Sequence, residues 1–180
     1  MARRTELGPT SEKQDLELRL RNNRAVHLRP GVAKRVAQRL GVPASWIRFI
    51  PLALTDQLLK RIKEERFLDP DVLRRMKNAK VLRSADPHPI ERELIALRQS
   101  QGERSVILLP EEAPDTGGIE LLLAELVRAT DSLVGFDTTD VVAVSKDLSF
   151  GFVVEHFRDR TATGVEPTYR LMTWAPDDGR

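Results

Sequence analysis

Apolar residues in the first part of the chain recur every three or four positions, which is the spacing of amphipathic helices. The clearest of these helices begins at Pro30 and places Val32, Val36 and Leu40 on one face. Three further segments have the same spacing: "LTDQLLKRIKEERFL", "DPDVLRRMKNAKVL" and "PIERELIALRQSQG". The pattern therefore predicts a helical region over residues 12–101.

The chain before residue 12 has no apolar period, so we expect a disordered arm over residues 1–11. The next residues, 12–23, fit either a helix or a short strand. As a strand, Leu16–Leu20 would pair with Arg104–Leu109 and would join the two halves of the chain in one sheet.

Beyond residue 104 the pattern is typical of strands. "RSVILLP" predicts a buried strand, residues 140–157 predict a hairpin that turns at Lys146–Leu148, and "TYRLMTW" predicts a last strand. Between them, "IELLLAELVRATDSL" predicts one helix. The expected fold class is α+β: an N-terminal all-helical basic region, followed by a small antiparallel sheet covered by one helix. Residues 104–176 form an acidic α+β module in this interpretation.

Charge is unevenly distributed along the chain. The formal net charge is +2, but basic residues prevail up to residue 109 and acidic residues prevail after it. Such a division indicates a surface that faces a polyanion, joined to a part with another role. The same residues also fit a simpler interpretation, in which they form the solvated faces of amphipathic helices.

A stretch near residue 40 has the spacing of two helices joined by a tight turn. Ala37 stands where such helices cross, Gly41 stands in the turn, and Pro43 begins a short second helix that Pro51 ends. The apolar residues that would hold the pair together are Val36, Leu40, Val42, Ile47 and Ile50.

Residues 31–50 therefore resemble the helix-turn-helix of bacterial DNA-binding regulators, in which the second helix enters the major groove. The resemblance implies that Ala44, Ser45 and Arg48 face the bases, with Arg48 as a strong reader of guanine. It implies phosphate contacts for three residues of the first helix, which are Lys34, Arg35 and Arg39. Phe49 departs from the motif, which usually exposes a polar residue there. Two core helices with a glycine turn fit the same spacing.

A second basic cluster lies further along the chain, beyond residues 31–50, and consists of Arg74, Arg75, Lys77 and Lys80. Together with the first cluster it predicts a surface for nucleic acid, with duplex DNA favoured over RNA. The chain has few aromatic residues, at 5%, on which single strands would stack.

The sequence lacks the common catalytic and cofactor-binding motifs. The three histidines stand singly, without an HExxH motif or a pair at helical spacing. "PDTGGIE" has the two glycines of a phosphate-binding loop but no lysine, and its acidic neighbours would repel an anion. We therefore expect a protein that is not an enzyme and that uses no cofactor and no metal.

The C-terminal pattern "VVAVSKDLSFGFVVEHF", followed by "YRLMTW", is similar to the closing hairpin and strand of bacterial immunity-type proteins. The resemblance implies a module that covers a protein partner, and the acidic charge favours a basic one. The residues themselves fit equally a sheet that completes the fold or holds a homodimer together.

The chain has no cysteine and no apolar run of the roughly 20 residues that cross a bilayer, so we expect a cytoplasmic protein without membrane contact. The predicted function is non-enzymatic DNA binding, as in a transcriptional regulator or an antitoxin, with a C-terminal module for dimerisation or partner binding. The alternative is an immunity-type inhibitor that masks a protein partner without binding DNA.

Overall fold

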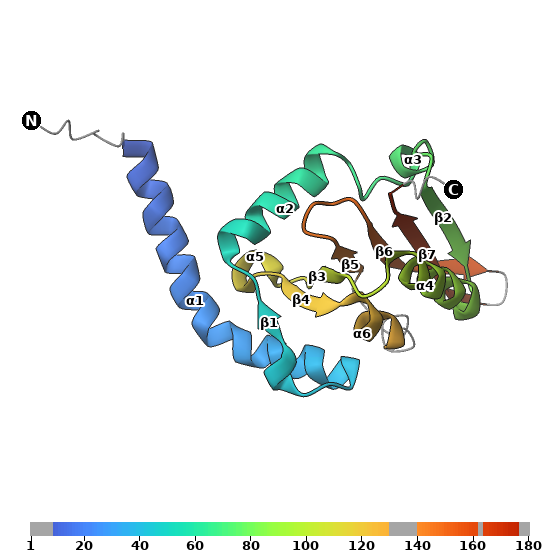
Figure 1. The fold of residues 1–180 in the computed structure, drawn as a ribbon, viewed down its shortest axis with the longest axis horizontal. Coiled ribbons are helices and arrows are strands. Elements are labelled where there is room, and N and C mark those ends of the chain that lie inside the picture. Colours follow the sequence, from blue (N-terminus) through green and yellow to red (C-terminus); the bar gives the residue numbers. More distant parts are fainter. Residues whose placement is uncertain (1–8, 130–139, 162–163, 177–180) are drawn as a thin grey trace, which may run out of the picture.

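The computed structural model describes residues 9–129, 140–161 and 164–176 (Figure 1). Within these ranges the chain has a mixed α+β fold, which confirms the expected class, around a seven-stranded antiparallel sheet with the order β1-β4-β3-β5-β6-β7-β2. The strands are β1 (Arg48–Phe49), β2 (Ala79–Ser84), β3 (Ser105–Leu109), β4 (Ile119–Leu122), β5 (Val141–Val144), β6 (Gly151–Thr161) and β7 (Gly164–Trp174). The helices are α1 (Pro9–Leu40), the 3-10 turn η1 (Ala44–Trp46), α2 (Leu52–Glu64), α3 (Pro70–Leu73), α4 (Pro87–Gln101), α5 (Ala113–Thr116) and α6 (Leu123–Arg128).

Helices cover both faces of the sheet, and each face has its own core. Successive side chains of a strand point to opposite faces. Val106 and Leu108 of β3 therefore pack with α4, α6 and the C-terminal half of α1. Ile107 and Leu109 pack with α2 and α3 on the other face. In Figure 1, α2 lies across the strands from α6 and from the end of α1.

The helix expected before residue 102 is confirmed as α4. Its apolar residues Ile90, Leu94 and Leu97 are buried against the sheet, as their spacing predicts. The Asp86 side chain caps the first turn by accepting a hydrogen bond of 3.0 Å from the backbone N–H of His88.

The expected hairpin is also confirmed, as β5 and β6 joined by a turn through residues 145–150. Asp147 organises this turn, because its carboxylate accepts hydrogen bonds from the Ser145 hydroxyl at 2.7 Å and from the backbone N–H and hydroxyl of Ser149 at 3.1 and 2.8 Å. These donors stabilise the charged form and lower the pKa of Asp147 to about 2. The turn is thus held by a carboxylate that is ionised at neutral pH.

The sheet crosses the boundary expected near residue 104. Its two edge strands, β1 and β2, come from the region 12–101, which is therefore not all-helical. The segment "DPDVLRRMKNAKVL" contains the four-residue helix α3 and then β2, where a single helix was expected. Sequence spacing did not identify β2 because an edge strand tolerates charged residues, and Lys80 and Arg83 mask its alternation.

The expectation of a single helix over the sheet is wrong. "IELLLAELVRATDSL" begins with strand β4 and continues into the short helix α6, which ends at Arg128, and its last residues lie outside the described part of the chain. A short apolar run has no periodicity that separates a buried strand from a helix. Pairing between β3 and β4 decides the conformation of residues 119–122.

Helix α1 is much longer than the segment expected from Pro30. It begins at Pro9 and passes through Pro30, so residues 9–11 are helical rather than part of an arm, and residues 1–8 lie outside the described residues. Leu16–Leu20 belong to this helix and do not pair with β3, whose neighbours are β4 and β5.

Within the described ranges, no helix, α1 included, combines the length and apolar character that a membrane span requires.

Candidate functional site

The second helix of the expected helix-turn-helix is absent. Residues Ala44–Trp46 form a 3-10 turn, and Arg48 and Phe49 form β1, which pairs with Glu120 and Ile119 of β4. The backbone N–H of Ile50 then donates to the carbonyl of Gly118 at 2.9 Å. Strand pairing therefore outweighs the helical spacing of this segment, and no helix presents Ala44, Ser45 and Arg48 to a DNA groove.

The first half of the pair is present. Val32, Val36 and Leu40 are buried on one face of α1, as predicted, and α1 ends at Leu40, just before Gly41, whose φ is +65°. The helix face therefore packs on the sheet instead of on a second helix.

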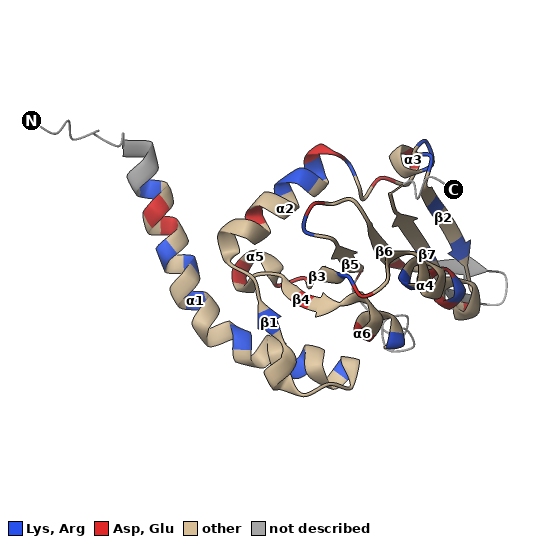
Figure 2. Ribbon diagram, viewed as in Figure 1, with Lys and Arg blue, Asp and Glu red and all other residues tan. Residues whose placement is uncertain are grey.

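The structure divides the predicted DNA-binding residues into two separate groups. Lys34, Arg35 and Arg39 lie on α1, and Ala44, Ser45 and Arg48 lie just beyond it. The second group follows α3 or lies on β2 and comprises Arg74, Arg75, Lys77 and Lys80. Figure 2 shows α1 and β2 at opposite ends of the molecule, so the two groups do not form one surface. In the second group, Arg74 pairs with Asp71 at 2.8 Å and Lys80 with Glu93 at 2.7 Å.

Arginines of α1 bind acceptors of the same chain on α2, on α5 and before α5. Arg21 donates two hydrogen bonds of 2.9 Å to Asp56, and this interaction raises the pKa of Arg21 above its ordinary value. Arg24 lies 4.0 Å from Asp115, and Arg29 donates to the carbonyl of Thr116 at 2.8 Å. Part of the charge that suggested a polyanion partner is therefore used inside the fold.

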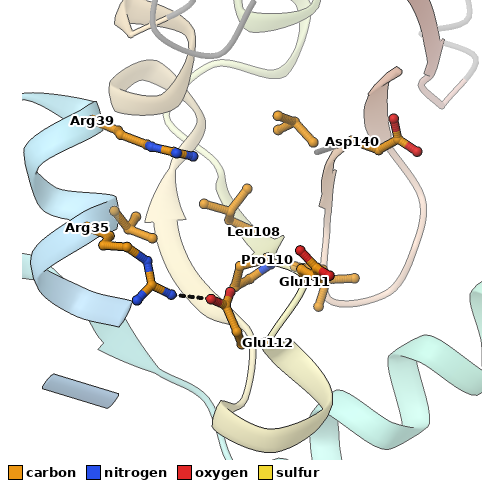
Figure 3. A pocket seen from close by; sticks show the side chains of 10 residues that line it. Arg35, Arg39, Leu108, Pro110, Glu111, Glu112 and Asp140 are labelled. Atoms are coloured by element: carbon orange, nitrogen blue, oxygen red, sulfur yellow. Dashed lines mark hydrogen bonds and ion pairs between the residues drawn. The ribbon is translucent and has the colours of Figure 1, made fainter. Parts of the chain in front are cut away.

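A small cavity of about 220 Å³ lies where α1 passes the connection between β3 and α5 (Figure 3). Arg35 and Arg39 line it from α1, and Glu111, Glu112 and Asp140 line it from the facing segments. Arg35 forms an ion pair with Glu112. The cavity thus contains charged groups of both signs, of which Arg35 and Glu112 form an ion pair, and its lining includes no nucleophile paired with a base.

A larger groove of about 640 Å³ lies at the other side of the end of α1, along the edge of the sheet. Its apolar lining consists of Leu40, Val42, Trp46, Leu121 and Leu122. Its polar lining consists of Ser45, Arg48, Ser105, Glu120 and Glu125. The volume falls within the range of ordinary binding clefts.

Trp46 and Leu122 are exposed within this groove. Trp46 is 57% exposed and Leu122 is 43% exposed. Trp46 is held by the 3-10 turn, in which its backbone N–H donates to the carbonyl of Pro43 at 3.0 Å. A tryptophan so exposed at the mouth of an apolar groove is typical of a surface that contacts another molecule.

Sequence reasoning did not identify this groove. Phe49 packs partly buried against the core, with the Arg29 guanidinium 5.2 Å from its ring centre, whereas Trp46 remains outside. The available signal was the position of Trp46 in "PASW", since short polar turns place their side chains toward solvent.

Metal binding has no candidate in the described part of the chain, where no group of three or more His, Asp or Glu side chains is placed to hold an ion. Comparisons with family models, with curated proteins and with solved structures found no match to the chain. The site must therefore be interpreted from its own residues.

Proposed function

We propose that the protein is a non-enzymatic binding protein that recognises an apolar segment of another polypeptide in the groove beside Trp46. The exposed tryptophan within an apolar groove is the single observation that carries this proposal. The proposal corresponds to the partner-masking alternative, and a cytoplasmic location stays a prediction.

The composition of the groove supports a polypeptide ligand. Protein interfaces combine an aromatic or aliphatic anchor with a polar rim that fixes orientation. Trp46 and Leu122 supply the anchor, while Arg48 on one strand and Glu120 on its neighbour supply charges of both signs. Such a rim suits a peptide with mixed charge better than it suits a polyanion, because Glu120 would repel phosphate.

Panning a displayed library of random peptides against the protein should enrich sequences with bulky apolar residues. Trp46→Ser should weaken their binding by about tenfold or more, because the substitution removes the anchor. Leu68→Ser is the matched control, since Leu68 is also exposed but lies outside the groove, and it should leave affinity unchanged. Enriched peptides that bind Trp46→Ser as tightly as the wild type, or no enrichment at all, would exclude the groove as a polypeptide site.

Duplex nucleic-acid binding is a second candidate, favoured by one specific observation. Every charged residue between Leu18 and Thr55 is basic. Lys34 and Arg48 are exposed within this stretch. A basic surface of this kind binds phosphates without reading sequence, and no reading helix is needed for it.

Fluorescence anisotropy with random duplex DNA across a salt titration tests this second candidate. Binding should weaken steeply with salt, and Lys34→Ala should lower the slope of log K against log salt by about one unit. Arg75→Ala, in the remote basic group, serves as the control and should leave the slope unchanged. Absence of binding at low salt would remove the candidate.

A further inference from the structure

The first turns of α1 form a second unpartnered apolar surface. Leu16 and Leu20 are 58% and 61% exposed, and four positions of separation place them on the same side of the helix. The structure describes the side chains of α1 from Lys13 onward. Among these, Arg21 is the first whose side chain forms a hydrogen bond with another element. Figure 1 shows this part of α1 standing clear of the rest of the molecule.

Within the described part of the chain, the turns of α1 before Arg21 are stabilised only by their continuity with the rest of the helix. Isolated helices shorter than about 12–15 residues are marginal in water, and protein helices depend on packing of an apolar face. Leu16 and Leu20 have no such packing against the residues that the structure describes. The segment therefore has the character of a helix that packs on another molecule.

The groove beside Trp46 fits this segment in position and in charge. The exposed leucines lie at the start of α1, and the groove begins at its end, with Leu40 and Val42. Two α1 helices that run antiparallel would each bring their leucines to the groove of the other molecule. In such a twofold dimer, the leucine surface of each copy covers the groove of the other, so that no leucine surface and no groove remains open.

The charges beside the leucines complement those of the groove. Lys13 is exposed and can face Glu120, and the exposed Glu17 can face Arg48. Arg19 and Glu125 are already paired within the chain, with Asp15 and Arg128 respectively. Opposite charges at the rim of an apolar contact favour one partner and one orientation.

From these observations we propose that the groove receives the N-terminal turns of α1 from a second copy of this chain, so that two copies exchange these helices reciprocally. This inference rests on the proposed function, because it names the polypeptide that the groove binds. The same contact would occupy the groove and thereby regulate its access to other partners.

Sedimentation of the full chain tests the exchange. The wild type should form a dimer, and the double variant Leu16→Ser and Leu20→Ser should weaken dimerisation by about tenfold or more, as should Trp46→Ser. Ile95→Ser, an exposed residue of α4, is the control and should leave the dimer unchanged. A mixture of the leucine variant and the Trp46 variant should recover part of the association, because one intact contact forms in each mixed pair.

Cysteine pairing gives a second measurement. The chain has no cysteine of its own, so Leu20→Cys in one preparation and Leu122→Cys in another should join by a disulfide when the two are mixed and oxidised. Leu20→Cys mixed with Ile95→Cys should not join.

The outcomes separate this inference from the proposed function. A chain that is monomeric up to about 100 µM, or a dimer that ignores both sets of substitutions, overturns the exchange. If such a chain still binds panned peptides through Trp46, the proposed function stands and only the identity of the occupant is wrong. If it binds neither peptides nor a second copy, both fail.

Discussion

Gly117→Ala is expected to lower the free energy of unfolding by about 3 kcal/mol. Gly117 has φ +90° and ψ 155°, a conformation that side chains strongly disfavour. A Cβ placed there would lie 2.4 Å from the carbonyl oxygen of Ile50, which is backbone and cannot rotate away. Denaturant titration of the purified variant measures the loss.

The contact next to Gly117 explains why the cost is high. The carbonyl of Gly118 accepts a hydrogen bond from the N–H of Ile50, and the N–H of Gly118 donates to the Thr55 hydroxyl at 2.9 Å inside the protein. Moving the chain away from the new Cβ would break both bonds and leave buried polar groups without partners. Backbone relaxation therefore offers little relief.

Gly41→Ala is the matched control for Gly117→Ala. Gly41 also has positive φ, at +65°, but a Cβ there would meet no atom within 4 Å. Its substitution should cost about 1 kcal/mol, which is the conformational penalty alone. Equal losses at the two glycines would show that the close approach to Ile50 contributes nothing.

The two glycines of "PDTGGIE" have a structural role that sequence reasoning did not identify. The missing lysine and the acidic neighbours argued against a phosphate loop. What Gly117 and Gly118 provide instead is a close packing of the chain before β4 against the end of β1. That role depends on the contact between Ile50 and Gly117. These two residues are 67 positions apart, so local sequence patterns do not contain the contact.

Elements with long, regular periodicity could be predicted from the sequence. Helices α2 and α4 and the hairpin of β5 and β6 follow directly from apolar spacing. Short strands could not be predicted in this way. Strands β1, β2 and β4 have only two to six residues each, and their conformation is decided by the strands that pair with them. Tertiary pairing overrides local propensity in such segments.

The candidate site shows the same limit. Leu40 and Val42 were expected to hold two helices together, and they line the groove because the following residues pair with β4 instead. Leu122, placed on a helix by its apolar run, stands at the end of that strand. The site could not be predicted because its parts meet only when residues 48–49 join the sheet.

The charge division illustrates a pattern whose meaning changes in three dimensions. Basic residues of α1 and acidic residues near α5 are distant in sequence, yet Arg24 faces Asp115 and Arg35 faces Glu112. Exposed pairs of this kind contribute little to stability, roughly 0–1 kcal/mol each, but they orient α1 on the body of the protein. This use of charge leaves the exposed apolar surfaces as the stronger indication of a partner.

The largest loss of stability is expected for Trp174→Ala, at about 4 kcal/mol. Trp174 is 2% exposed at the end of β7 and stacks on Phe67, with ring centres 4.8 Å apart. Its indole N–H donates to the carbonyl of Leu148 at 2.9 Å, so it also fastens the turn between β5 and β6. Alanine would leave a cavity and an unpaired buried carbonyl.

Two comparisons separate the contributions of Trp174. Trp174→Phe keeps most of the apolar volume but loses the hydrogen bond, so it should cost about 1–3 kcal/mol less than alanine does while still destabilising the turn. Trp46→Ala removes the other tryptophan of the chain, which stands largely in solvent, and at a protein concentration low enough to keep the chain monomeric it should change stability by less than about 0.5 kcal/mol. Thermal unfolding followed by circular dichroism ranks the three variants.

A loss at Trp46 as large as that at Trp174 would contradict the placement of Trp46 outside the core, and with it the groove. The expected ranking would instead assign the two tryptophans to different tasks. Trp174 joins the end of β7 to Phe67, between α2 and α3, and to Leu148, in the turn between β5 and β6, and both residues lie far from it in sequence. Trp46 would then contribute little to folding, and its exposure beside Leu121 and Leu122 in one groove would remain available for the contact that we propose.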